Sequence, residues 1–278
     1  NAKKPVMVWF HGGGFYNGSS IEGVAYDGKN LSDFGDVVVV TVNHRLNALG
    51  YMDLSDYGED YQYSGNCGTA DLVASLKWVK ENIANFGGDP DNVTIFGQSG
   101  GGGKVISMLA SPEAEGLFNQ AIVQSGSERY IEKDTAKKIT EKTLEILGIT
   151  DNQIEQLKEV PYDILDAAAT EAMKQVGEEL GTSLSWRPVL DEDYIQSNFQ
   201  EWTNDIPVMV GSVFGEMNCW TALDPNETNK NSWTDEEVDA KLTEKYGDKA
   251  EAVKEAFLKA YPEKSACDAY YVADRTKF

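Results

Sequence analysis

The sequence has little of three things: long apolar runs, basic residues and cysteine. No apolar run approaches the ~20 residues of a membrane-spanning helix, and no basic segment followed by an apolar stretch marks a signal peptide. The chain has 24 Lys and Arg against 46 Asp and Glu, a formal net charge of −22, which opposes binding to nucleic acids. Cys67, Cys219 and Cys267 are too few and scattered for a disulfide framework or metal site, so we expect buried thiols.

The composition is that of a folded protein. The 278 residues are 41 % hydrophobic and 10 % aromatic, enough to bury a large core, and this excludes disorder. The chain begins at Asn1 rather than Met, almost inside its first apolar run, which indicates a processed or truncated product. Length alone allows one large domain or two ordinary ones.

Short apolar runs rich in β-branched residues predict a parallel sheet. Continuous apolar runs are typical of strands that are buried on both faces of such a sheet. Between the runs lie helical patterns, the clearest at 69–85, where Leu72, Leu76, Val79 and Ile83 recur at helical spacing. The alternation predicts an α/β fold with a mostly parallel central sheet flanked by helices. The predicted strands are 6–10, 37–42, 93–96, 121–123 and 208–210.

A charged, helix-forming segment interrupts the strands at 134–181. Its apolar anchors, such as Leu144 and Leu157, predict an inserted helical region over the sheet. Further on, Thr234 and Glu237 have the spacing of a capping box and predict the start of another helix. No repeat or low-complexity linker divides the chain, so residues 1–278 are predicted to form a single domain.

Two glycine-rich turns carry the chemistry. Gly97-Gln98-Ser99-Gly100-Gly101 follows a β-rich run and fits the G-x-S-x-G nucleophile elbow, in which a serine occupies a sharp strand-to-helix turn. His11-Gly12-Gly13-Gly14 follows the first strand and fits the loop that binds the oxyanion in lipases and esterases. Taken alone, the first motif fits an ordinary tight turn as well as a nucleophile elbow, and the second fits a flexible turn. The presence of both motifs in this order favours a hydrolase.

The wider pattern resembles the type-B carboxylesterases, the cholinesterase-like branch of the α/β-hydrolases. The resemblance extends over most of the chain, which lacks the family's first strands and its C-terminal part, and it implies the α/β-hydrolase fold. It includes the strand and loop at 8–15, the strand at 40–46 (with His44 where tyrosine is usual), the signature at 65–90 and the strand at 117–127.

The resemblance also implies roles for individual residues. Ser99 would attack an ester carbonyl, and the N–H groups of Gly13, Gly14 and Gly100 would bind the oxyanion. Glu216 would be the acid of the triad. Around them, Ser125 would support that acid, and Gln98 stands where the family commonly has glutamate. This chemistry needs no cofactor or metal, and the expected substrate is a small-molecule carboxylic ester.

The triad histidine does not appear where the family has it. No histidine follows Glu216, and the two in the chain, His11 and His44, both precede Ser99. Each is better explained as a structural residue of its loop or strand end than as a relocated base. We therefore expect the general base in a C-terminal part outside this chain, or on a separate chain that carries the rest of the enzyme.

Three functional hypotheses follow. The first is a serine carboxylic-ester hydrolase acting through an acyl-enzyme. The second is a non-catalytic, esterase-like binding or adhesion module, motivated by the missing histidine and opposed by the retained Ser99. A Rossmann-type nucleotide binder fits badly, because the glycines at 100–103 do not give G-x-G-x-x-G.

Two expectations concern substrate contacts and location. The aromatic residues Phe15, Tyr16 and Trp220 are candidates either for lining a substrate site or for packing. The absence of a visible signal peptide and of the cysteine loops of secreted animal members favours a bacterial cytoplasmic protein, with secretion left open.

Overall fold

The computed structural model describes residues 2–216 and 233–272, so Cys219 and Trp220 lie outside the described residues. The chain divides into two units, Asn1–Val210 and Gly211–Phe278, and each is described by itself. The prediction of a single domain stays a prediction.

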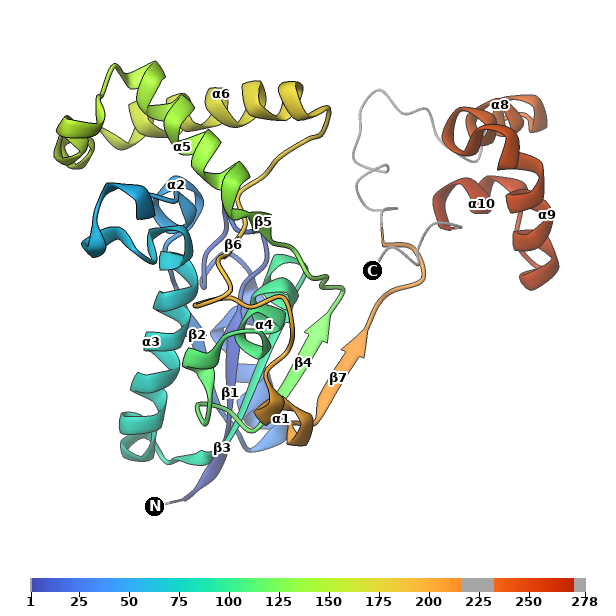
Figure 1. Cartoon of the computed structure of the whole chain (residues 1–278). Coiled ribbons are helices and arrows are strands. Elements are labelled where there is room, and N and C mark those ends of the chain that lie inside the picture. The colour runs from blue at the N-terminus through green and yellow to red at the C-terminus, as the bar shows by residue number, and fades with distance from the viewer. Residues whose placement is uncertain (1, 217–232, 273–278) are drawn as a thin grey trace. The chain divides into compact units, whose positions relative to one another are not determined.

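The five predicted strands are all present and form one sheet (Figure 1). Its strand order is β2-β1-β3-β4-β7, and the pairs β1–β2, β1–β3 and β3–β4 are parallel. The α/β prediction with a mostly parallel sheet is therefore confirmed. The strands are β1 (Lys4–Phe10), β2 (Val38–Val42), β3 (Gly88–Gln98), β4 (Gln120–Gln124) and β7 (Val208–Gly211).

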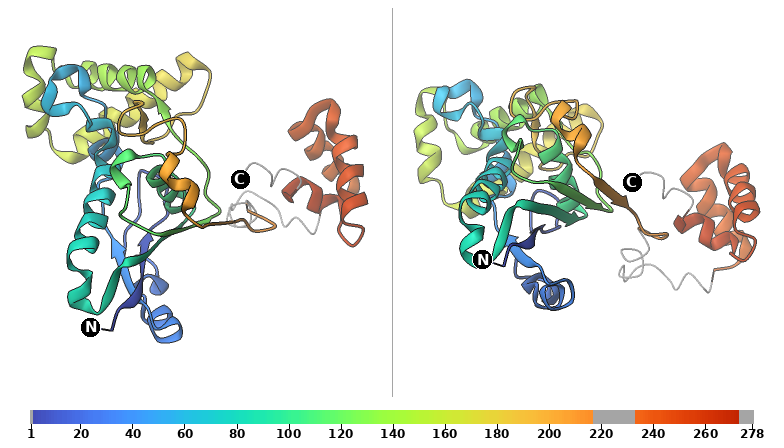
Figure 2. Two further views of the ribbon diagram at one scale, coloured as in Figure 1. Left: turned by 60° about the horizontal axis from the view of Figure 1, so that its bottom comes forward. Right: turned by 90° about the horizontal axis from the view of Figure 1, so that it is seen from below.

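One face of the sheet holds the main core. Alternate residues of β1, namely Val6, Val8 and Phe10, are fully buried against helices α3 (Cys67–Asn82) and α4 (Gly100–Leu109). Side chains of a strand alternate between the two faces, so the residues between them point the other way. On that side Trp9 packs against Tyr26 and Phe96. Helix α1 (Lys29–Gly35) lies on the face opposite α4 (Figure 2).

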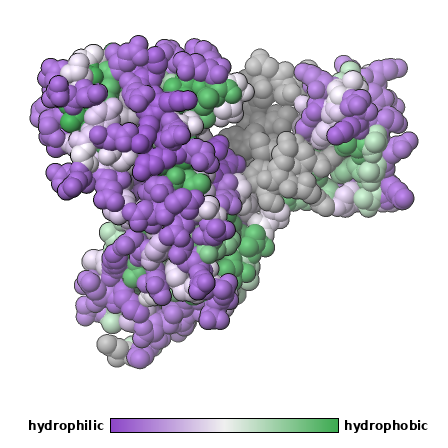
Figure 3. Space-filling model, in the orientation of Figure 1, coloured by the Kyte–Doolittle hydropathy of each residue, from purple (hydrophilic) through white to green (hydrophobic). Residues whose placement is uncertain are grey.

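Strand β7 differs from the prediction of strands buried on both faces. Val208, Met209 and Val210 are 42 %, 67 % and 71 % exposed. A hydrophobic patch lies over this part of the molecule, on a surface that is otherwise mostly hydrophilic (Figure 3). The reason is positional, because β7 is the last strand of the sheet and only β4 pairs with it among the described residues.

A second core lies at the carboxyl end of the strands, where the predicted helical segment 134–181 is found. The segment contains most of α5 (Lys133–Leu147), a 3₁₀ helix (Asp151–Glu159) and α6 (Tyr162–Leu180). Figure 1 shows α5 and α6 beyond the ends of the strands rather than against a face. They share a core with α2 (Asn47–Tyr51), and next to α5 the short strands β5 (Ile131–Glu132) and β6 (Val189–Leu190) pair in parallel.

The second unit contains three described α-helices, α8 (Asp235–Tyr246), α9 (Ala250–Ala260) and α10 (Ala266–Val272). They enclose a small core of their own that includes Leu242 and Phe257. The predicted capping box is confirmed, because the Thr234 hydroxyl accepts from the N–H of Glu237 and the Glu237 carboxylate accepts from the N–H of Thr234. In neither unit is any described helix long and apolar enough to cross a membrane.

Candidate active site

Three neighbouring parallel strands end at one edge of the sheet and deliver the candidate site. The glycine loop at 11–14 follows β1, Ser99 follows β3, and Ser125 follows β4. Because parallel neighbours have their carboxyl ends on the same side, the three segments meet there. The backbone confirms the meeting of the last two, since the N–H of Ser99 donates to the carbonyl of Gln124 over 2.9 Å.

Ser99 occupies a strained turn. Its φ of 58° and ψ of −122° lie outside the regions that L-residues favour, which costs about 1–3 kcal/mol in typical cases. The turn is also tight, because a Cβ on Gly97 would lie 2.5 Å from the carbonyl carbon of Gly101. The serine is exposed at the tip of this turn, at the first residue before α4. This is the geometry of a nucleophile elbow.

The glycine loop presses against the start of α4. A Cβ on Gly100 would lie 2.5 Å from both the Cα and the nitrogen of Gly14, so only glycine allows this approach. A Cβ on Gly12 would lie 3.7 Å from the Cβ of Ser99, which brings the loop to the serine itself. The loop turns through positive φ at Gly13 (81°) and Gly14 (63°), and the N–H of Asn17 closes it on the Gly13 carbonyl at 3.1 Å.

This packing leaves backbone donors beside the serine. Among the hydrogen bonds of the described residues, none is donated by the N–H of Gly13 or Gly14. Gly100 is the first residue of α4, where helix N–H groups have no partner within the helix. Unpaired N–H groups at a helix start favour a negative charge, which is what an oxyanion requires. The three predicted oxyanion glycines are thus brought together next to Ser99.

Two predicted supporting residues lie in the same unit as the serine. Ser125 is half-buried and, like Ser99, has a positive φ (49°). Gln98 is exposed, and its side-chain oxygen would lie 3.7 Å from a Cβ on Gly12. An amide therefore borders the glycine loop where a glutamate would place a negative charge. A neutral group there avoids opposing the charge of an oxyanion.

Glu216 belongs to the second unit, so its predicted partnership with Ser99 stays a prediction. The residue is half-buried, and its carboxylate accepts a hydrogen bond of 2.7 Å from the N–H of Val213. This bond holds the carboxylate close to the backbone that follows β7.

Neither histidine is placed to act as a general base. His11 is fully buried, and its Nδ1 donates to the carbonyl of Gly12 at 2.9 Å rather than to a carboxylate. Its ring packs 4.8 Å from that of His44. Burial, with a smaller contribution from Lys104, lowers the pKa of His11 to about 4 and that of His44 to about 2. Groups with such values bind a proton too weakly to remove one from a serine hydroxyl at neutral pH.

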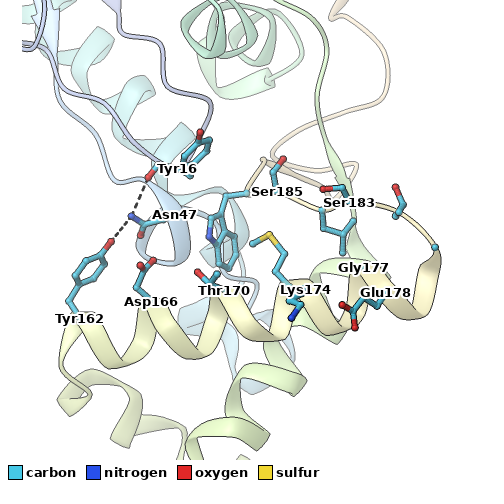
Figure 4. Close-up of a pocket in the computed structure, with 15 residues that line it drawn as sticks. Tyr16, Asn47, Tyr162, Asp166, Thr170, Lys174, Gly177, Glu178, Ser183 and Ser185 are labelled. Atoms are coloured by element: carbon cyan, nitrogen blue, oxygen red, sulfur yellow. Dashed lines mark hydrogen bonds between the residues drawn. The ribbon is translucent and has the colours of Figure 1, made fainter. Parts of the chain in front are cut away.

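A pocket opens at Tyr16, two residues after the glycine loop, and sequence reasoning missed it. It has a volume of about 770 Å³, and Tyr16 forms part of its wall. Asn47 joins the two sides, since its side-chain amide donates to the Tyr162 hydroxyl at 2.9 Å and to the Tyr16 carbonyl at 3.5 Å (Figure 4). One face of α6, from Tyr162 to Glu178, forms one wall, and the chain at 181–186 forms another. These segments are far apart in the sequence, and Tyr16 alone was a candidate.

The aromatic candidates have different surroundings. Phe15 packs in the second core, edge-on to Tyr51, whereas Tyr16 is exposed at the pocket. The part of the chain that the structure describes contains no cluster of three or more side chains suited to hold a metal ion.

Comparisons with known proteins agree with this geometry. The profile of the carboxylesterase family matches residues 1–275. The para-nitrobenzyl esterase of Bacillus subtilis (strain 168) is 41 % identical over 217 residues, which are 76 % of this chain and 44 % of that protein. Carboxylesterase 3 of Homo sapiens is 50 % identical over 123 residues, which are 44 % of this chain and 20 % of that protein.

Solved structures give the same result. An esterase from anaerobic Clostridium hathewayi, described as able to hydrolyze aliphatic aromatic polyesters, superposes with a TM-score of 0.81 at 46 % identity, covering 98 % of this chain and 55 % of that one. A Geobacillus stearothermophilus carboxylesterase gives 0.70 at 38 % identity, covering 88 % and 52 %. The chain spans about half the length of these structures and less than half of the curated relatives. The chain has the α/β-hydrolase fold of these structures, and the family profile matches nearly its whole length. It therefore belongs to the carboxylesterase family.

Proposed function

We propose that the protein is a serine carboxylic-ester hydrolase with Ser99 as its nucleophile. The observation that carries the proposal is the strained turn of Ser99 set against the glycines of the loop. A serine that only packed or bound a partner would not need an unfavourable backbone conformation. The family membership supports the same reaction class, and so do the esterases found among the sequence relatives and among the solved structures.

In the proposed reaction, the Ser99 oxygen attacks the ester carbonyl carbon while a base removes its proton. The carbonyl oxygen becomes an oxyanion, and the N–H groups of Gly13, Gly14 and Gly100 stabilise it. The tetrahedral species collapses, the alcohol leaves with the proton from the base, and an acyl-enzyme remains. Water then attacks the acyl group by the same route and frees Ser99.

The base and its acid complete the proposal. We assign the acid to Glu216 and the base to a histidine outside the printed chain, on a C-terminal segment or a separate chain. Neither histidine is suited, as their lowered pKa values indicate, and the chain spans about half the length of its solved relatives. Ser125 is proposed to support the acid.

The substrate is proposed to be a small carboxylic ester with an aromatic or aliphatic group. The pocket at Tyr16 supports this, since Tyr16, Tyr162 and Trp186 line it together with polar side chains. The described polyester activity of the Clostridium hathewayi enzyme involves groups of both kinds. A cytoplasmic location is also proposed, supported by the Cys67 thiol, which forms no disulfide among the described residues.

The test is turnover of a p-nitrophenyl ester by the protein as purified from its natural source and by a Ser99→Ala variant. We expect the variant to lose activity by about 10⁴-fold or more, because the acyl-enzyme cannot form. Ser75→Ala is the control, since that hydroxyl donates to the Leu72 carbonyl within α3, away from the glycine loop and the elbow. Equal activity of the protein and its Ser99→Ala variant would remove Ser99 as nucleophile, and with it this proposal.

A further inference from the structure

A lysine lies fully buried in the helix that begins at the nucleophile. Lys104 is the fifth residue of α4 and has no exposed surface, whereas the other large side chains of that buried face are apolar, Val105 and Met108 among them. Burying an ammonium group without a charged partner lowers the stability of the folded chain, so a lysine at this position needs an explanation. The catalytic proposal gives it no part.

Among the described residues, this amine contacts the two residues that flank Gly12–Gly14. Its Nζ donates to the carbonyl oxygen of His11 at 2.9 Å, and it lies 5.9 Å from the centre of the Phe15 ring. His11 and Phe15 are the residues immediately before and after Gly12–Gly14. Lys104 therefore touches both ends of the loop that presents the oxyanion donors, from the helix that follows Ser99.

Such a connection meets a need of the loop. Three consecutive glycines have no side chains to fix them, and glycine has more backbone freedom to lose than any other residue. Oxyanion donors act only when they are held within about 0.5 Å of the position where the charge develops. Elsewhere the loop is held by backbone bonds, including one from the N–H of Asn47 to the carbonyl of Phe15 at 2.9 Å.

We propose that Lys104 is a positioning residue, which ties the oxyanion loop to the nucleophile helix through the His11 carbonyl and the Phe15 ring. The inference rests on the proposed function for its catalytic consequence, but the tie itself is a property of the fold. Because the amine lies beneath the loop, its effect on catalysis passes through the Gly13 and Gly14 donors.

The surroundings of the amine make this tie sensitive to pH. The titratable groups that act on it are His11 and His44, with Glu22 as the acidic one. Burial lowers the pKa of Lys104 to about 7, while both imidazoles stay neutral down to about pH 4. Opening the loop exposes the amine to water and restores its ordinary pKa, so above pH 7 the open loop binds a proton that the closed loop has released. The closed loop is therefore held more firmly at pH 8.5 than at pH 6.

The first experiment measures hydrogen exchange of the Asn17 and Asn47 amides, which donate to the carbonyls of Gly13 and Phe15, in the 278-residue chain. Lys104→Met keeps the length of the side chain and removes its donor, and Met108→Ala is the matched control, fully buried one turn along the same helix. At pH 8.5 we expect Lys104→Met to exchange these amides at least tenfold faster than the unmodified chain. Met108→Ala should change them by less than threefold.

Protection by the tie should also rise between pH 6 and pH 8.5, after correction for intrinsic exchange, in the unmodified chain and not in Lys104→Met. Equal protection of the loop in the chain and in Lys104→Met would overturn the proposal, as would equal loosening by Met108→Ala. This measurement needs no activity, so it judges the tie even if Ser99 proves not to be the nucleophile.

The second experiment is kinetic and uses the active protein from its natural source. We expect Lys104→Met to lower kcat for a p-nitrophenyl ester at least tenfold, with KM changed less than threefold. A trifluoromethyl ketone, which forms an oxyanion on the serine, should bind more weakly by a similar factor. A loosened loop with unchanged kcat and unchanged ketone affinity would overturn the positioning role.

Discussion

At the residue scale, the backbone of Ser99 carries a measurable strain. Its φ and ψ are accessible to glycine at little cost but not to residues with a Cβ. We expect Ser99→Gly to be about 1 kcal/mol more stable than the unmodified chain, since relief of strain of about 1–3 kcal/mol exceeds the added entropy of unfolding. Urea unfolding would measure the difference.

Ser99→Ala separates strain from loss of the hydroxyl. Alanine retains the Cβ, so its stability should stay within about 0.5 kcal/mol of the unmodified chain. If Ser99→Gly were no more stable than Ser99→Ala, the turn would not be strained, and the main support for the nucleophile would weaken.

Lys104 adds a pH-dependent cost to the fold. Its pKa is lowered from 10.5 to about 7 by burial, so between these values the unfolded chain holds a proton that the folded chain has released. The free energy of unfolding then rises with pH by about 1.4 kcal/mol per unit across this window and is flat below it. Lys104→Met lacks this dependence. Its stability advantage over the unmodified chain should shrink as the pH rises from 7 to 9.

The comparison of the two proteins cancels every other titrating group, so the difference in urea midpoints at several pH values reports Lys104 alone. His11 and His44 do not contribute in this window, because both are neutral above about pH 4. A constant difference between pH 7 and 9 would contradict the buried, proton-releasing amine.

At the element scale, the predictable parts of the fold were those with local signals. The strands and α3 follow from apolar runs and helical periodicity, and the elbow and the loop follow from glycines at fixed spacing after a strand. The exposure of β7 was not predictable, because its composition is that of a buried strand and only its place in the sheet leaves it open.

The parts of the site that escaped prediction are contacts between distant segments. Lys104 meets His11 across 93 positions, and Asn47 meets Tyr162 across 115. Neither pairing has a local pattern. The one available signal was a lysine within Gly100-Gly-Gly-Gly-Lys-Val-Ile-Ser-Met-Leu109, a charge in a helix otherwise composed to be buried. A lone charge in such a helix is a reason to look for a partner.

At the scale of the whole molecule, the first unit has a prepared nucleophile turn, but neither of its two histidines is suited to act as the base. The loop, the elbow and the helix start are assembled within the first unit. His11 is fully buried, His44 is half-buried, and the pKa values of both lie far below 7. Preorganised donors without a base are expected to give only a small part of the rate of a complete triad.

This combination predicts how the 278-residue chain reacts with a fluorophosphonate, which forms a covalent bond to an activated serine. A neutral serine hydroxyl is a weak nucleophile, and loss of the triad base costs about 10⁴–10⁶-fold. Intact-mass spectrometry should therefore show labelling of this chain at least about 10³-fold slower than labelling of the Bacillus subtilis para-nitrobenzyl esterase under the same conditions. Ser99→Ala identifies the labelled residue. Rapid stoichiometric labelling that Ser99→Ala abolishes would mean that a group within this chain activates the serine, and the base would then have to be sought among its own side chains.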